Sequence, residues 1–259
     1  MIYKFSGAGN DFVVLDGRKG GVDEYRTVPV IKDLCMQYRT DGLMILGDAP
    51  GYDFGMEFYN PDGSGGMMCG NGGRCITAFA DLLGIGPGNG EVYRFMAPDG
   101  EHSAQILDKG EKWTVRLKMI DVKEVKPMMG GFFLNTGTRH FVKFVLDIEG
   151  IDMEKDGPEI RWDEAFQPEG TNANFVELRA DGLHVRTFEK GVEGETLACG
   201  TGLTASAIAA YVKGCAQQVV NLQCRRGDWL RVEFTPCEDG FKDVYLTGPA
   251  ELVKTIDHV

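Results

Sequence analysis

Two cysteines in matching glycine-rich settings are the residues of this chain best suited to chemistry. Cys69 lies in MMCGNGGRC and Cys199 in LACGTG, so both begin the pattern Cys-Gly-x-Gly. Apolar residues with helical spacing follow each cysteine, and Gly84 and Gly214 are expected to end the two helices. The free N–H groups of a helix N-terminus attract carboxylates and favour a thiolate over a thiol. A single cysteine before glycines is most simply interpreted as a small buried residue at a turn. Two cysteines in the same setting indicate a functional pair.

Paired thiols suit the inversion of a carbon that carries a hydrogen. One group must remove a proton from one face of the carbon while another supplies a proton to the opposite face, and each must be a competent acid or base near neutral pH. An amino acid Cα–H is very weakly acidic, so two helix N-termini aimed at its carboxylate would stabilise the carbanion. The pattern therefore indicates inversion at a carbon such as an amino acid Cα.

The two motifs belong to an internal duplication. An offset of 130 positions places Cys69 on Cys199, and an offset of 128 places Gly9 on Gly137. Matching features in the same order, at offsets that agree within a few residues, indicate two homologous halves.

Each half is expected to form one domain, over residues 1–122 and 123–259. Segments such as KWTVRLKM and WLRVEF alternate apolar with polar residues, and turn sequences link neighbouring strands at hairpin distance. With one helix after each cysteine, the predicted fold class is α/β (α+β) with mostly antiparallel sheets.

Composition and charge exclude several classes of partner. The chain of 259 residues is 43% hydrophobic and carries a formal net charge of -12, which argues against nucleic acid and anionic membrane surfaces as partners. No secretory leader is recognisable and no run approaches ~18 consecutive apolar residues, so we expect a cytoplasmic protein. The seven cysteines are odd in number and scattered, so free thiols are expected.

The motifs resemble those of the diaminopimelate epimerase family over essentially the whole chain. The resemblance rests on SGAGNDFVVLD, NPDGSGGMMCGNGGRC and TFEKGVEGETLACGTG. It implies an isomerase without a cofactor or metal that interconverts LL- and meso-diaminopimelate, a small diamino dicarboxylic acid, for lysine and peptidoglycan precursor biosynthesis. It also implies two similar halves, each a curled sheet around a central helix, with the active site in the cleft between them, and a homodimer.

The resemblance assigns roles to individual residues. Cys69 and Cys199 match the catalytic cysteines, His140 matches the partner of the first cysteine, and Glu189 matches the glutamate beside the second. On the residues alone, a core histidine and a solvated glutamate would be the simpler interpretations. The positions that match substrate-binding residues are Asn10, Asn60, Gly70, Asn71, Thr138, Asn172, Glu189, Lys190, Gly200 and Thr201.

Some positions depart from the family pattern. Thr138 and Arg139 replace a usual Asn-Pro pair, Lys190 replaces a usual arginine, and segment 38–46 looks a few residues short. Lysine keeps the charge of arginine but loses its bidentate fork. We expect these changes to affect substrate affinity more than reaction type.

Two other functions stay open. A proline or hydroxyproline racemase would also use two cysteines, although such enzymes usually carry a histidine where Asn71 stands. A metal-binding or redox-sensing protein would also use clustered cysteines, but the spacing from Cys69 to Cys75 does not suit a common zinc knuckle.

Overall fold

The protein is described by a computed structural model that covers residues 1–66, 68–88 and 90–256. Within these ranges, no helix has both the length and the apolar character needed to cross a membrane.

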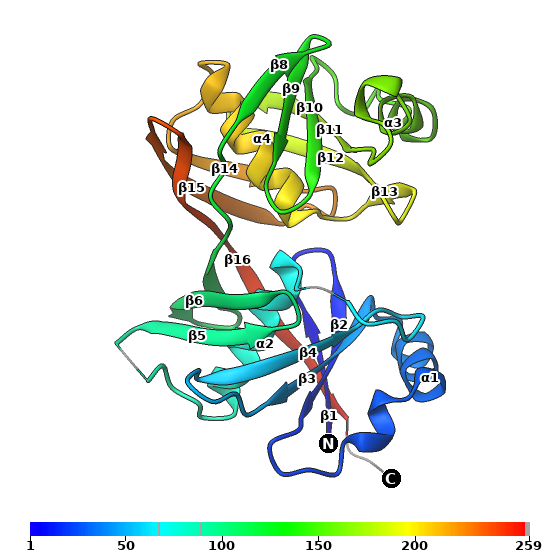
Figure 1. The fold of residues 1–259 in the computed structure, drawn as a ribbon, viewed down its shortest axis with the longest axis vertical. Helices are drawn as coiled ribbons and strands as arrows, with labels where there is room; N and C mark the ends of the chain where they lie inside the picture. Colours follow the sequence, from blue (N-terminus) through cyan, green and yellow to red (C-terminus); the bar gives the residue numbers. More distant parts are fainter. Residues whose placement is uncertain (67, 89, 257–259) are drawn as a thin grey trace. The chain divides into compact units, whose positions relative to one another are not determined.

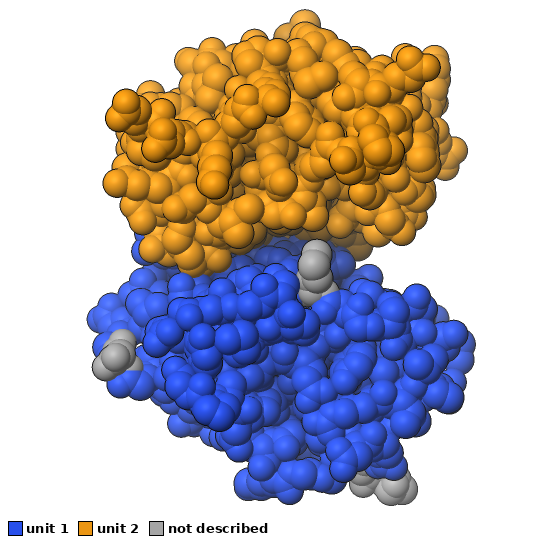
Figure 2. All heavy atoms as spheres, viewed as in Figure 1, with its two compact units in different colours: residues 1–117, 248–259 blue, residues 118–247 orange. Residues whose placement is uncertain are grey.

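The chain divides into two compact units, Met1–Leu117 with Gly248–Val259, and Lys118–Thr247 (Figures 1 and 2). The last strand belongs to both, because its first residues lie in the second unit and its later residues in the first. The division into homologous halves at residues 122 and 123 stays a prediction.

The first unit contains a sheet with two parallel steps. Strands β2 and β3 are parallel, as are β4 and β5, whereas the pairs β1–β2, β1–β16, β3–β4, β5–β6 and β6–β7 are antiparallel. A parallel pair needs a crossover, and α1 and α2 lie in the two crossovers. The elements are β1 (Ile2–Ser6), β2 (Asp11–Asp16), η1 (Asp23–Arg26), α1 (Val28–Tyr38), β3 (Gly42–Gly47), β4 (Phe54–Tyr59), α2 (Gly70–Leu82), β5 (Val92–Ala97), β6 (Gly100–Lys109), β7 (Trp113–Lys118) and the later part of β16 (Gly240–Ile256).

The second unit repeats this order. Strands β10 and β11 are parallel across α3, and β12 and β14 are parallel across α4, while the other pairs are antiparallel. The prediction of two similar α/β halves with mostly antiparallel sheets is confirmed. The elements are β8 (Val125–Met128), β9 (Gly131–Asn135), β10 (Arg139–Phe144), α3 (Met153–Arg161), η2 (Glu164–Phe166), β11 (Asn172–Arg179), β12 (Gly182–Glu189), β13 (Gly194–Thr196), α4 (Gly200–Val212), β14 (Val219–Gln223), β15 (Trp229–Cys237) and the start of β16.

Each unit has a buried helix at its centre. Helix α2 packs against β1, β2, β3 and β6, and α4 packs against β9, β10, β11, β12, β14 and β15. Gly84 and Gly214 follow the helices with positive φ angles of 75° and 81°, as the sequence predicted. The central helices are therefore fixed by sheet contacts on several sides, and so are the loops that enter them.

Phe79 provides a test of how much this core contributes to stability. Its buried ring packs against Tyr3 and Phe5 at centroid distances of 4.9 and 5.7 Å. We expect Phe79→Ala to lower the free energy of unfolding by about 3–5 kcal/mol, through lost contacts and a residual cavity. Leu82→Ala on the same helix, where Leu82 is 39% exposed, should cost about 1 kcal/mol or less. Urea unfolding followed by circular dichroism measures both, and equal losses would contradict the prediction.

Candidate active site

The first cysteine begins helix α2. Cys69 is the N-cap residue, with extended backbone angles of φ -107° and ψ 155°. Its Sγ accepts a hydrogen bond from the Gly72 N–H at 3.3 Å. The predicted position, where a loop enters a helix, is confirmed. A hydrogen bond of this kind is stronger when the sulfur carries a negative charge.

A buried arginine lies about one turn further along α2. It was not among the site residues predicted from the sequence. Arg74 is fully buried, and its guanidinium donates to the Asn71 Oδ1 at 2.7 Å and to the carbonyl oxygens of Gly7 and Gly70 at 3.1 Å each. Asn71 in turn donates from Nδ2 to the Asn10 Oδ1 at 2.7 Å. Arg74 thus joins Asn10, Gly70 and Asn71, all of which were predicted to bind substrate.

Arg74 also fixes the direction of these amides. A guanidinium only donates hydrogen bonds, so the oxygen of Asn71 must face Arg74 and its nitrogen must face Asn10. Asn10 then accepts through Oδ1, and its Nδ2 is directed away from Asn71 as a donor. The network therefore presents a donor of known orientation beside the start of α2.

Asn60 lies in a turn of its own. Its Nδ2 donates to the Ser64 Oγ at 3.0 Å, and its backbone N–H donates to the Ser64 carbonyl at 2.9 Å. Among the described residues, no hydrogen bond joins Asn60 to Asn10 or Asn71. The simpler interpretation, a turn asparagine, accounts for these contacts, and a role in substrate binding stays a prediction.

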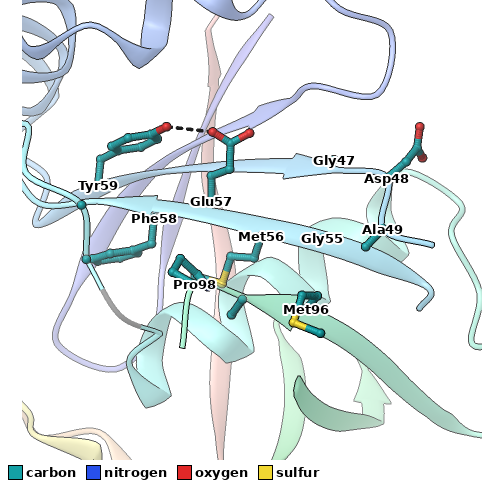
Figure 3. A pocket seen from close by; sticks show the side chains of 13 residues that line it. Gly47, Asp48, Ala49, Gly55, Met56, Glu57, Phe58, Tyr59, Met96 and Pro98 are labelled. Atoms are coloured by element: carbon teal, nitrogen blue, oxygen red, sulfur yellow. Dashed lines mark hydrogen bonds between the residues drawn. The ribbon is translucent and has the colours of Figure 1, made fainter. Parts of the chain in front are cut away.

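A cavity of about 460 Å³ lies in the first unit beside the end of β4 (Figure 3). Its lining is mainly apolar and includes Met56, Phe58, Met96 and Pro98. None of the site residues predicted from the sequence lines this cavity.

The second cysteine begins helix α4. Cys199 is its N-cap residue, with φ -124° and ψ 105°, and is only 7% exposed. Burial raises the pKa of the Cys199 thiol well above its ordinary range, and the nearby Glu189 charge raises it further. Burial also raises the pKa of Glu189, and interactions with Thr196 and then Cys199 partly oppose this rise. The thiol form of Cys199 is therefore favoured at neutral pH.

His140 is buried in the second unit and has contacts at both ring nitrogens. Its Nδ1 lies 3.0 Å from the Asn174 Nδ2, and its Nε2 lies 2.9 Å from each of the hydroxyl oxygens of Thr138 and Thr201. Burial lowers the pKa of His140 to about 3, so the ring is neutral near pH 7. The role predicted for it, as the partner of Cys69, stays a prediction.

Asn172 and Lys190 are joined through the backbone. The Lys190 N–H donates to the Asn172 Oδ1 at 2.7 Å, and the Asn172 Nδ2 donates to the Arg139 carbonyl at 3.0 Å. Two basic side chains meet at Glu169, where the Arg139 guanidinium pairs with the carboxylate at 2.7 Å and the Lys190 ammonium donates to the carbonyl. The Lys190 ammonium thus donates one of its hydrogens to a backbone carbonyl of the protein.

The described contacts bring the predicted residues together in two sets, one in each unit. The first set contains Cys69, Gly70, Asn71 and Asn10, and the second contains Thr138, His140, Asn172, Glu189, Lys190, Cys199, Gly200 and Thr201. In the part of the chain that the structure describes, no group of three His, Cys, Asp or Glu residues could hold a metal ion.

Comparison with known proteins identifies related sequences. The sequence model of a family described as diaminopimelate epimerase matches residues 2–125 and 132–253. The diaminopimelate epimerase of Aquifex aeolicus is 40% identical over 95% of this chain and 93% of that protein. The diaminopimelate epimerase of Chlorobaculum tepidum is 39% identical over 96% of this chain and 97% of that protein.

Solved structures with much lower identity share the fold. A Bacillus anthracis phenazine biosynthesis protein of the PhzF family has a TM-score of 0.76 at 12% identity, covering 98% of this chain and 96% of that one. A hydroxyproline epimerase from Agrobacterium vitis has a TM-score of 0.61 at 15% identity, covering 98% of this chain and 90% of that one.

The different surroundings of the two cysteines predict different reactivity. Cys69 is partly exposed and its sulfur accepts a backbone hydrogen bond, whereas Cys199 is buried and its pKa is raised. Because the thiolate is the reactive form, we expect iodoacetamide at neutral pH to modify Cys69 at least about tenfold faster than Cys199. Mass spectrometry of the digested protein over time measures both rates. Denaturation should bring the two rates together, and faster labelling of Cys199 in the folded protein would contradict the prediction.

Proposed function

The chain belongs to the diaminopimelate epimerase family, and from that premise we propose that Cys69 and Cys199 together invert one α-carbon of diaminopimelate. The reaction interconverts the LL and meso forms. The observation that carries the proposal is the equivalent position of the two cysteines, each the N-cap residue of the buried central helix of its unit. Each thiol can exchange a proton beside the N–H groups of a helix N-terminus.

The first residues of both helices are proposed to bind the α-carboxylate. The first N–H groups of an α-helix have no acceptor within the helix, and the aligned peptide dipoles add positive potential there. We assign this role to the N–H groups of Gly70 and Asn71 in α2 and of Gly200 and Thr201 in α4. They would stabilise the negative charge that develops when Cα loses its proton.

The two sulfurs are proposed to start in opposite protonation states. The Gly72 N–H favours a thiolate at Cys69, whereas burial and Glu189 raise the pKa of Cys199 and favour the thiol. The Cys69 thiolate takes the proton from Cα, and the Cys199 thiol gives its proton to the opposite face. One C–H bond breaks as another forms, and one S–H bond replaces the other. Proton exchange with water resets the sulfurs, and the reverse reaction uses the reversed protonation.

Other side chains are proposed to hold and support the substrate. The family resemblance alone pairs His140 with Cys69, while its described ring contacts are with Asn174, Thr138 and Thr201 of its own unit. Glu189 is proposed as the partner of Cys199. Contacts with the substrate's polar groups are proposed for Asn10, Asn60, Thr138, Asn172, Glu189 and Lys190.

Two further properties of the working protein are proposed, of which the first rests on the family resemblance alone. We propose a homodimer, which analytical ultracentrifugation would detect. We also propose that the enzyme acts in the cytoplasm, in the biosynthesis of lysine and peptidoglycan precursors.

The proposed function predicts exchange of the substrate's Cα hydrogen with solvent. In D2O we expect LL-diaminopimelate to gain deuterium at Cα and to convert to the meso form. Cys69→Ser and Cys199→Ser should each lower conversion by about a hundredfold or more, because a serine hydroxyl is a poor acid and base at neutral pH. NMR measures the deuterium content, and chiral chromatography measures the diastereomer ratio.

Cys237→Ser is the matched control, since Cys237 is an exposed free cysteine, and it should keep wild-type activity. If the reduced wild type exchanges no Cα hydrogen of diaminopimelate, the substrate assignment is wrong. Proline and hydroxyproline, tested under the same conditions, then decide the alternative.

Arg74 predicts a second effect on activity. Arg74→Lys keeps the charge but loses the planar fork that contacts Asn71, Gly7 and Gly70 together. Asn10 then loses its fixed orientation, and we expect kcat/KM to fall at least about tenfold, which corresponds to about 1.4 kcal/mol. Steady-state epimerisation rates test this, with Arg94→Lys, at a surface ion pair with Glu101, as control. Equal kcat/KM values for the two variants would count against a role for Arg74.

A further inference from the structure

We propose that the Thr201 hydroxyl is a catalytic group of the second half of the site, donating a hydrogen bond to the Cys199 sulfur when that sulfur is a thiolate. His140 is the positioning residue, because its ring donates to the Thr201 oxygen and leaves the hydroxyl hydrogen free to turn toward Cys199. The proposal rests on the proposed function in that Cys199 reacts with substrate.

The distances support a continuous chain of hydrogen bonds. The Cys199 Sγ lies 3.4 Å from the Thr201 Oγ1, which lies 2.9 Å from the His140 Nε2 and 3.2 Å from the Thr138 Oγ1. All four residues belong to the second unit. Thr201 is therefore the residue through which His140 reaches the Cys199 sulfur.

The contacts of Asn174 show which atoms donate and which accept in this series of hydrogen bonds. Its Nδ2 lies 3.0 Å from the Phe141 carbonyl oxygen, which can only accept, so this atom must be the amide nitrogen. Its Oδ1 accepts from the Thr187 hydroxyl at 2.9 Å, which agrees with the same orientation. The nitrogen of Asn174 therefore also donates to the His140 Nδ1.

Because Nδ1 accepts, the single proton of the neutral imidazole is on Nε2. The Thr201 hydroxyl can then only accept from His140, and its own hydrogen must point elsewhere. Among the described residues, the acceptors within reach are the Thr138 oxygen and the Cys199 sulfur. A negatively charged sulfur is the stronger of these acceptors.

The two cysteines obtain their hydrogen bonds differently. In α2 the Cys69 sulfur accepts from the Gly72 N–H, and the side chain of Asn71 is held by Arg74 and Asn10. In α4 the described contacts include no capping bond to the Cys199 sulfur. This sulfur lies 3.4 Å from the Thr201 hydroxyl oxygen, and the Thr201 hydroxyl and the Gly202 N–H both lower the pKa of Cys199. The second unit thus offers a side-chain hydroxyl where the first unit uses a backbone amide alone at its cap.

Burial and the carboxylate of Glu189 oppose the thiolate that this donor would stabilise. Glu189 disfavours the thiolate by its charge, and burial removes the stabilisation that water would give. His140 is neutral at working pH and brings no positive charge. Among the side chains described as interacting with this sulfur, the Thr201 hydroxyl favours the charged form.

Three substitutions at position 201 test the proposal. Thr201→Val keeps the shape and the backbone N–H but removes the hydroxyl, Thr201→Ala removes it without a branched side chain, and Thr201→Ser restores it. The readout is the rate at which iodoacetamide modifies Cys199 at several pH values, measured by mass spectrometry. At pH values below the pKa of Cys199, this rate is proportional to the fraction of Cys199 that is a thiolate.

We expect iodoacetamide to modify Cys199 about tenfold more slowly in the valine and alanine variants at each pH. This difference corresponds to a Cys199 pKa that is higher by about one. The serine variant should return to the wild-type rate, and the rate at Cys69 should not change in any variant. In epimerisation, kcat should fall in the valine variant with little change in KM, because the backbone N–H is retained.

An unchanged Cys199 rate in folded Thr201→Val or Thr201→Ala would overturn the proposal and leave the proposed function untouched. A wild type that exchanges no substrate hydrogen would overturn the proposed function, while the alkylation rates would still decide the role of the hydroxyl. The part played by His140 is tested by ¹⁵N NMR of its ring, which should show the neutral form with the proton on Nε2. A proton on Nδ1 would overturn it.

Discussion

The N-terminus of a buried helix is the constraint on which the rest of this structure depends. A helix start leaves N–H groups without partners, and here each unit surrounds its central helix with a sheet and places a cysteine at that start. The second glycine of the pattern Cys-Gly-x-Gly lies in crowded surroundings in both units. A Cβ on Gly202 would lie 2.4 Å from the Asn174 Oδ1, and one on Gly72 would lie 3.3 Å from the Cys69 Sγ. A side chain at position 202 would press on Asn174, which contacts His140, and one at position 72 would press on the Cys69 sulfur itself.

Buried polar side chains then determine what these helix starts can do. Burying Arg74, His140 and Asn174 is unfavourable unless their hydrogen bonds are made, and the structure makes those bonds with directional partners. The result is a set of side chains with one permitted orientation: Asn71 toward Asn10, and the His140 ring with its proton on Nε2. The hydrogen bonds that make burial of these polar side chains possible therefore also fix the positions of donors around the proposed reaction.

Sequence patterns could predict the parts of this arrangement that are local. The two cysteines at helix starts and the C′ residue Gly84 depend on their immediate neighbours, and the prediction was confirmed. Helix α3 was not predicted, because Gly157 and Pro158 lie inside it. The glycine is needed there, since a Cβ would lie 2.4 Å from the Phe188 ring.

The burial and the contacts of Arg74 could not be predicted either, because a charged residue among glycines looks like a surface residue. Its acceptors include the carbonyl oxygens of Gly7 and Pro249, which are remote in sequence.

The difference between the surroundings of the two cysteines could not be predicted from the sequence motif either. Two-base inversion needs one sulfur charged and one protonated at the same moment, which identical surroundings would not favour. Asn71 and Thr201 follow the same Cys-Gly pair, yet Asn71 turns to Arg74, whereas Thr201 turns to His140 and Cys199. The tertiary partners, and not the repeated motif, therefore give the two cysteines different surroundings.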